Sequence, residues 1–396
     1  TFTLTGVNNA SLIVSAGTVA LSGAGTLSAT RGVVVSGGAT LSISGANGDR
    51  SIGGLVGGNA NSTVALGNNT LTLNTSTGQQ FNGVIEGTGG VVKTGTGLSV
   101  FSEQNTYTGG TTVNAGSLHL TGSGSLASTG ALAVGSAGAF DITAANGART
   151  VGALSGDANG RLRLGANSLT VDQSTATAFA GTIGSTGGGL VKQGSGTLTL
   201  AGANTYTGGT TVQAGTLLIG SGGTGSVVGD VQVNSGSTLG GSGTIGGNVA
   251  VASGATLSPG NSPGTLTIGG DLTLDAGSTT RLELGEAGAV GGARNDLVSV
   301  GGNLTLGGRF ASHGLLRRLV PAVQLRGDRF HGHACGQLCK HGCHRQRRLC
   351  LGKSPALDHP GGGHHARPGQ PGGAGRGPDD AVVDRCQRRQ LGWRHL

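Results

Sequence analysis

Residues 188–217 have the sequence GGLVKQGSGTLTLAGANTYTGGTTVQAGTL, in which short apolar-polar alternations are separated by turns rich in glycine and asparagine. Leu198 and Leu200 alternate with Thr197 and Thr199. This period of two predicts a short β-strand whose leucines face a core and whose threonines face water. Glycine and asparagine tolerate the backbone conformations that tight turns require, so the stretch predicts strands joined by turns.

The same stretch occurs a second time in the chain, 99 residues earlier. Eighteen of the 32 residues from Gly89 to Leu120 are identical to those at the same positions in 188–219. The offset also relates residues 46–50 to residues 145–149, and residues 16–19 to residues 115–118. A unit of 99 residues is therefore duplicated, and a duplicated unit of this kind is typical of repeat proteins.

Strand patterns continue outside the duplicated unit, for example at residues 266–268, 272–274 and 304–306, and no helical periodicity of useful length occurs. Glycine supplies 85 of the 396 residues and aromatic residues only 3%, which disfavours an all-β sandwich array with an aromatic-rich core. We therefore expect an all-β solenoid of parallel strands. A turn of roughly 20 to 25 residues would give about 12 to 15 turns.

Charge and cysteine divide the chain at residue 308. Residues 1–308 contain nine Lys/Arg and twelve Asp/Glu, a net charge of −3, and no cysteine. Residues 309–396 carry a net charge of +11 and all five cysteines. We therefore expect a repetitive β-helix region at residues 1–308 and a separate basic segment, rich in Cys, His, Arg and Pro, at residues 309–396.

The stretch at residues 188–217 resembles the passenger-associated transport repeat, also called the autotransporter-associated β-strand repeat, of bacterial autotransporters. The segment that begins LSPGNSPGTLTI at residue 257 is similar to the region that follows such repeats, and NDLVSV at residue 295 continues it. The earlier copy departs from the pattern at residues 98–104, where a shifted or imperfect strand is expected.

The resemblance implies a right-handed parallel β-helix that is exported by type V secretion. It implies a location on the cell surface or outer membrane of a Gram-negative bacterium, or secretion from it. The implied partner is a C-terminal outer-membrane barrel of the same polypeptide, whose strand pattern is not found after Gly308. A host surface, matrix or glycan is the further expected partner, and neither nucleic acid nor a cofactor is expected.

For residues 309–396 we expect an irregular tail that is either disordered or produced by a frameshift in a GC-rich gene. A zinc site at Cys335, Cys339, Cys343, His344 and Cys350 is the alternative, but this spacing does not follow the paired pattern of structural zinc sites. A basic nucleic-acid-binding arm would need interleaved aromatic residues, which the tail lacks.

The sequence predicts no catalytic, cofactor-binding or metal-binding residues, and therefore no enzyme. The glycine-rich segment 241–246 matches a dinucleotide-binding pattern, but no helix is expected after it. The only histidine before residue 309 is His119, for which we expect a surface position. The carboxylates are sparse, and six of them are expected to lie in solvent near turns: Asp49, Glu86, Glu103, Asp141, Asp157 and Asp172.

Two pairs of residues recur at equivalent positions of the duplicated unit. Lys93 and Lys192 are expected to lie at a solvated edge or to act as gatekeepers against stacking. Tyr107 and Tyr206 are expected to be packing residues that cap a turn, with a sugar- or protein-contacting ring as the alternative.

These features leave three hypotheses for function. The first is a structural or adhesive cell-surface passenger. The second is a stalk that promotes transport and carries a separate functional domain. The third, ranked last, is a β-helix enzyme acting on carbohydrates, which would require several carboxylates to converge on one groove.

Overall fold

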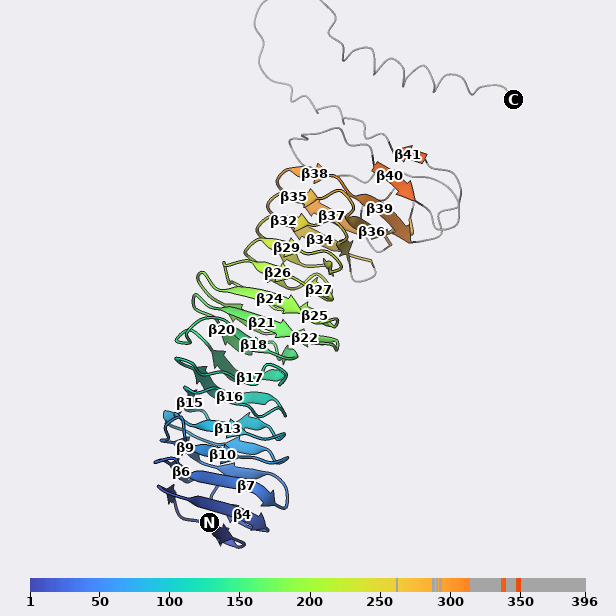
Figure 1. The fold of residues 1–396 in the computed structure, drawn as a ribbon. Helices are drawn as coiled ribbons and strands as arrows, with labels where there is room; N and C mark the ends of the chain where they lie inside the picture. Colours follow the sequence, from blue (N-terminus) through green and yellow to red (C-terminus); the bar gives the residue numbers. More distant parts are fainter. Residues whose placement is uncertain are drawn as a thin grey trace, which may run out of the picture. The chain divides into compact units, whose positions relative to one another are not determined.

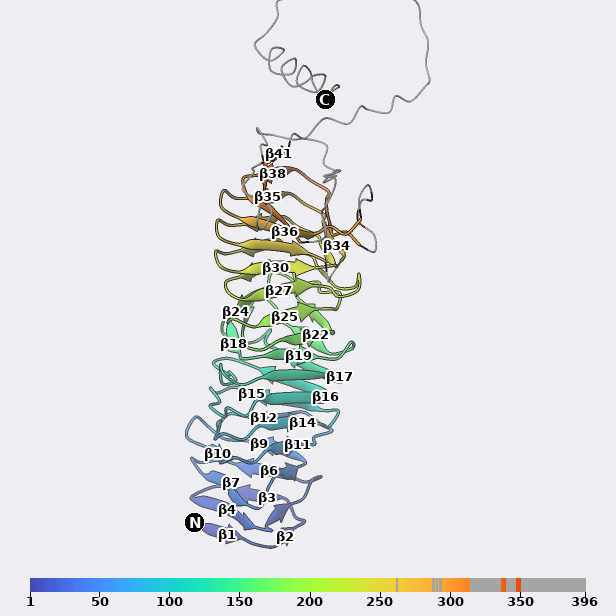
Figure 2. The same cartoon turned by 90° about the vertical axis from the view of Figure 1, so that its right-hand side faces the viewer.

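The strands of the chain form a parallel β-solenoid of about 13 turns, shown in two orthogonal views in Figures 1 and 2. This computed structural model describes residues 1–313 except 261, 262, 287, 288, 290, 292 and 293, together with two short strands at residues 336–339 and 347–349. Within the described residues every regular element is a strand. The predicted fold class is therefore confirmed, whereas the right-handed sense of the coil stays a prediction.

Each turn contributes up to three strands, so that successive turns build three faces, which we number in chain order. The first face consists of a five-stranded and an eight-stranded parallel sheet. Its strands are β1 (Phe2–Leu4), β4 (Thr18–Gly23), β7 (Thr40–Ala46), β10 (Thr63–Ala65), β13 (Val84–Glu86), β18 (Arg149–Val151), β21 (Ser168–Asp172), β24 (Gly189–Gln193), β26 (Thr210–Val212), β29 (Val231–Val233), β32 (Val249–Val251), β35 (Leu272–Leu274) and β38 (Leu304–Leu306).

The second face contains the longest continuous series of paired strands. Its strands are β2 (Val7–Asn8), β5 (Thr26–Leu27), β8 (Arg50–Ile52), β11 (Leu71–Leu73), β14 (Val91–Lys93), the first parts of β16 (Thr111–Leu120) and β17 (Leu132–Asp141), β19 (Leu154–Gly156), β22 (Thr177–Phe179), β25 (Thr197–Leu200), β27 (Thr216–Ile219), β30 (Thr238–Gly241), β33 (Thr256–Pro259), β36 (Thr279–Glu283) and β39 (Arg309–His313). Beyond it, β40 (Gly336–Cys339) pairs in parallel with β39, and β41 (Arg347–Leu349) pairs antiparallel with β40.

The third face completes each turn. Its strands are β3 (Leu12–Val14), β6 (Gly32–Val35), β9 (Gly54–Val56), β12 (Gln79–Phe81), β15 (Leu98–Phe101), the last parts of β16 and β17, β20 (Arg161–Arg163), β23 (Thr182–Gly184), β28 (Ser226–Val227), β31 (Thr244–Ile245), β34 (Thr265–Ile268) and β37 (Leu297–Val300). β16 and β17 continue around the corner between the second and third faces, with a register shift between Val113 and Ala115.

The core is a set of columns in which like side chains stack from turn to turn. Leu198 pairs with Leu217, Leu217 with Leu239, and Leu239 with Leu257, and all four are fully buried. The inward leucines predicted from the alternation at residues 197–200 are therefore confirmed. Because neighbouring turns supply the contacts that a globular core would supply, a narrow stack of aliphatic residues suffices.

The two copies of the duplicated unit begin on different faces. Val91–Lys93 starts the first copy on the second face, whereas Gly189–Gln193 starts the second copy on the first face. A spacing of 99 residues is therefore not a whole number of turns. The same local sequence forms the same strands and corners on whichever face it falls.

The chain divides into two compact units, Thr1–Leu351 and Gly352–Leu396, and the second lies outside the described residues. Arg309–His313 pairs in parallel with β36, so the described solenoid includes the first residues after position 308. The expectations for the rest of the tail, including the zinc ligands Cys343, His344 and Cys350, concern residues that the structure does not describe. No helix in the described part has the length and apolar character needed to cross a membrane.

Candidate functional site

Each copy of the repeat buries one lysine in the core. Lys93 lies in an inward column between Leu73 and Val113, and its side chain is fully buried. Its Nζ donates to the carbonyl oxygen of Gly95 on its own turn and, at 3.3 Å, to that of Ala115 on the next turn. Burial lowers the pKa of the Lys93 ammonium to about 8.

Lys192 repeats this arrangement on another face and is also fully buried. Its Nζ donates to the carbonyl oxygens of Gln193 at 2.6 Å and Gly194 at 2.8 Å. A third contact of 3.3 Å reaches the carbonyl oxygen of Ala214 on the next turn. Burial lowers the pKa of Lys192, while the negative charge of Asp172 acts in the opposite direction.

The expectation of a solvated edge for the two lysines is therefore wrong. A lysine side chain can be buried if its ammonium finds acceptors, and here the corner of the coil provides main-chain carbonyls as acceptors. The corner has this shape because Gly116 and Gly215 both adopt φ +67°, a left-handed conformation that favours glycine.

An asparagine takes the place of a strand in each repeat. Asn105 is buried where the first face has no strand between β13 and β18. Its Oδ1 accepts from the main-chain N–H of Ile85 at 2.9 Å. Its Nδ2 donates to the carbonyl oxygens of Glu103 and Ser125, both at 3.0 Å, so one side chain joins three successive turns.

Asn204 makes the equivalent contacts on the third face. Its Oδ1 accepts from the main-chain N–H of Ile183 at 2.9 Å. Its Nδ2 donates to the carbonyl oxygens of Gly202 and Ser226, both at 3.0 Å. The side-chain Oδ1 thus gives the N–H of Ile183 an acceptor, whereas the carbonyls of Gly202 and Ser226 also accept from main-chain N–H groups.

The two tyrosines are buried as predicted. The hydroxyl groups of Tyr107 and Tyr206 form 2.6 Å hydrogen bonds with the hydroxyls of Thr111 and Thr210 respectively. Burial raises the pKa of both phenols above the usual value, and the threonine hydrogen bonds act in the opposite direction. The packing role is therefore confirmed, and neither ring faces an external ligand.

A buried arginine precedes each repeat and is held in a comparable way. The guanidinium of Arg50 donates only to main-chain carbonyls, which belong to Gly23, Gly25, Gly48 and Asp49. The acceptors of Arg149 are the carbonyls of Gly122, Gly124, Asn146, Gly147 and Ala148. Burial lowers the pKa of Arg149. The match between residues 46–50 and 145–149 was the sequence signal for this pair.

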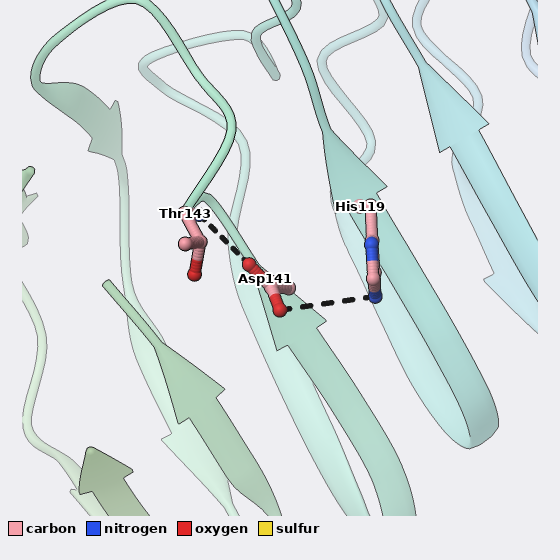
Figure 3. Close-up of polar contacts among 3 residues, drawn as sticks. All are labelled: His119, Asp141 and Thr143. Carbon is pink, nitrogen blue, oxygen red and sulfur yellow. Dashed lines mark hydrogen bonds and ion pairs between the residues drawn. The ribbon is translucent and has the colours of Figure 1, made fainter. Parts of the chain in front are cut away.

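The outward side of the third face carries a polar cluster, shown in Figure 3. His119 and Asp141 occupy neighbouring turns in register, and their Nε2 and Oδ2 atoms lie 3.8 Å apart. The Asp141 Oδ1 accepts from the main-chain N–H of Thr143 at 2.7 Å. The side chain of His119 is 31% exposed and that of Asp141 only 10%, so the histidine is at the surface as expected whereas Asp141 is not.

Two exposed arginines extend this cluster toward the next turn. Arg163 is in register with Asp141, and Arg161 points outward from the same strand, β20. Among the described residues His119 and Asp141 form the one ion pair within 4 Å. A histidine, a carboxylate and two guanidinium groups can bind ions or polar ligands, but a nucleophile activated by a base would need further groups in contact.

Other carboxylates hold turns together. Asp49 accepts from the main-chain N–H of Thr70, and Asp157 from that of Ser136. A longer series occurs at the corner before the first face, where each side chain accepts from the main chain one turn later. It links Asp230, Asn248, Asp271 and Asn303 at 2.6 to 2.8 Å.

No group of three or more metal-binding side chains is found in the described ranges. The glycine-rich segment 241–246 lies at the end of β30 and across β31, and the described chain continues from it as strand β32. It therefore lacks the helix that a dinucleotide site requires. The predicted absence of catalytic, cofactor and metal residues stays a prediction.

The three-faced coil and its twice-repeated internal contacts define a repetitive parallel β-solenoid. Residues 91–120 and 190–219 match the family model of the passenger-associated-transport-repeat, so the resemblance expected from residues 188–217 is confirmed. The chain is also similar to the adhesin BmaC autotransporter of Brucella suis biovar 1 (strain 1330), with 56% identity over 61 residues. This match covers 15% of the chain and 2% of that adhesin, so the chain spans a small part of its length.

Proposed function

We propose that residues 1–308 form a non-catalytic, adhesive segment of an autotransporter passenger. In this proposal the segment is displayed on the surface of a Gram-negative bacterium or secreted from it, and it is exported through a C-terminal outer-membrane barrel of the same polypeptide. A host surface, matrix or glycan is the adhesion partner. The basic segment at residues 309–396 does not contribute to adhesion. The similarity to an adhesin autotransporter supports this assignment.

One structural observation supports an adhesive role most directly. Five outward threonines of the second face lie in register on successive turns, and all are partly exposed: Thr197, Thr216, Thr238, Thr256 and Thr279. Neighbouring members of such a column are spaced by the ~4.8 Å distance between strands. The adjacent outward column consists of Thr199, Leu218, Gly240 and Ser258. Apart from Leu218, the side chains of this face are small and most are polar, which suits contact with an extended partner.

Arginine in this column is expected to reduce adhesion. In the variant T216R/T256R, two long cationic side chains would prevent close approach to the second face. The measurement is binding of the purified chain to cultured epithelial cells and to matrix-coated surfaces, with at least a tenfold loss of affinity expected, about 1.4 kcal/mol.

The matched control is T170R/T211R, which places the same two charges at outward positions of the first face. Equal losses in both variants would exclude the second face as the contact surface. If the unaltered chain binds neither cells nor matrix, the second candidate function is favoured, in which this region is a stalk that promotes transport. The two transport repeats are the observation that favours that candidate.

The solenoid is not expected to cleave carbohydrates. His119 and Asp141 lie next to each other on the third face, but no second carboxylate lies in their column of paired residues. The neighbouring members of the column include Val100 from β15 and Gly184 from β23. A reducing-end assay on acidic and neutral polysaccharides should show no release above a buffer control. Any release that H119Q/D141N abolishes would refute the non-catalytic assignment.

A further inference from the structure

The two repeat lysines occupy positions that the rest of their columns give to aliphatic residues. The column of Lys93 contains Ile52, Leu73, Val113 and Val134, and all of them are buried. The column of Lys192 contains Val151, Val171, Val212 and Val233, also buried. An ammonium at such a position loses its hydration, which is costly unless acceptors or a counter-charge replace the water.

No carboxylate compensates the charge of either lysine directly. Among the described residues neither Nζ lies within 4 Å of a carboxylate oxygen. The strands that flank Lys93 are β11, which carries no charged residue, and β16, whose single titratable residue His119 lies on another face. The strands that flank Lys192 are β26, which has none, and β21, which ends in the exposed Asp172.

The acceptors of each lysine come from two successive turns. Gly95 and Gly194 belong to the same turn as their lysine, whereas Ala115 and Ala214 belong to the next one. An ammonium group has three N–H donors that need acceptors when it is buried. Because one acceptor of each lysine belongs to the next turn, the set of acceptors is complete only when both turns are in place. If the turns separate, the ammonium regains water and the carbonyls regain solvent.

We propose that each transport repeat contains an opening point, formed by a lysine that is buried between two turns without a carboxylate in contact, so that the two turns open and close together and expose or bury the lysine ammonium as they do. The repeats are therefore less resistant to opening than the aliphatic turns around them. This inference concerns the solenoid itself and holds whether the region is adhesive or a stalk.

Proton binding by the two buried lysines is linked to folding. Burial lowers the pKa of Lys93 and of Lys192, so the folded chain binds fewer protons than the unfolded chain once the pH exceeds the folded pKa. Stability is therefore expected to rise with pH from about 8, the folded pKa of Lys93, toward the ordinary lysine value of 10.5. Below that window both states are protonated and the dependence disappears.

The first test uses the pH dependence of unfolding of the full chain. Thermal unfolding midpoints at pH 7.0 and pH 9.5 should differ by several degrees in the unaltered chain and by less than one degree in K93M/K192M. Methionine keeps the apolar stem and removes the proton, and any constant loss from the missing hydrogen bonds does not alter the slope. The control R161M/R163M removes two exposed cations and should keep the slope. An equal slope in all three proteins would overturn the proposal.

The second test measures opening directly. Lys93 and Lys192 are the only lysines among the described residues, so acetylation by a small amine-reactive reagent, read by mass spectrometry of peptides 91–120 and 190–219, reports their exposure. Labelling is expected at urea concentrations clearly below the midpoint of global unfolding. Labelling that follows global unfolding would contradict a local opening point.

Discussion

G215A is expected to be among the most destabilising single substitutions in the solenoid, lowering the free energy of unfolding by about 3 kcal/mol or more. Gly215 adopts φ +67°, a conformation that is strained for alanine, and an added Cβ would overlap the carbonyl oxygens of Gly194 and Gly196. The first of these carbonyls accepts a hydrogen bond from Lys192, so the collision would also displace the lysine's acceptors. Urea denaturation followed by circular dichroism measures the change.

The control for this prediction separates backbone strain from collision. Gly236 has φ +80°, but an added Cβ there would meet nothing within 4 Å. G236A should therefore cost only about 1 kcal/mol, the strain of the left-handed conformation. Equal losses in G215A and G236A would show that the close approach of the turns at Gly215 has no energetic weight.

N204A is expected to lower the free energy of unfolding by about 1 to 3 kcal/mol, because it leaves the buried main-chain N–H of Ile183 without its acceptor. The amide of Ile183 loses its acceptor, whereas the carbonyl of Gly202 keeps the main-chain N–H of Ser226 as a donor. The local measurement is hydrogen exchange at the Ile183 amide, which should lose its protection in the variant, together with urea denaturation of the whole chain.

Asn74 provides a matched comparison, since it is exposed and its side chain makes only two long hydrogen bonds, both of 3.4 Å: it donates to the carbonyl of Ala29 and accepts from the hydroxyl of Thr94. N74A should change stability by less than about 0.5 kcal/mol. Full protection of the Ile183 amide in N204A would mean that solvent or a rearranged neighbour replaces the asparagine, and that Asn204 does not substitute for a strand.

The alternation of residues predicted the strands and their inward side chains because burial on one side of a strand imposes a period of two, as Leu198 and Leu200 show. The duplicated unit predicted a solenoid because each copy can bury its apolar side chains only against neighbouring turns. The number of faces did not follow from the sequence. Strands of two to ten residues and corners of varying length hide the point at which one turn ends and the next begins.

The buried polar residues show where sequence reasoning reached its limit. Lysine is rarely buried, so the sequence predicts a surface position for Lys93 and Lys192. In the structure each lysine donates to a carbonyl of the next turn, which comes within reach only after the two turns have stacked. The identity of Asn105 and Asn204 between the copies was visible in the sequence. The role of the two asparagines could not be predicted from the sequence, because their side chains bond to main-chain N–H groups of the preceding turn at places where a face has no strand.

The displacement of the two repeats by one face has a consequence for molecules that bind this chain from outside. A whole-turn spacing would place both copies of the motif above one another, where a bivalent antibody or a receptor cluster could engage them from a single direction. Here equivalent residues of the copies at 91–120 and 190–219 lie on different faces of the solenoid. A bivalent binder raised against one copy would therefore bind the solenoid on two faces. It could cross-link neighbouring molecules instead of binding both copies of one molecule at once.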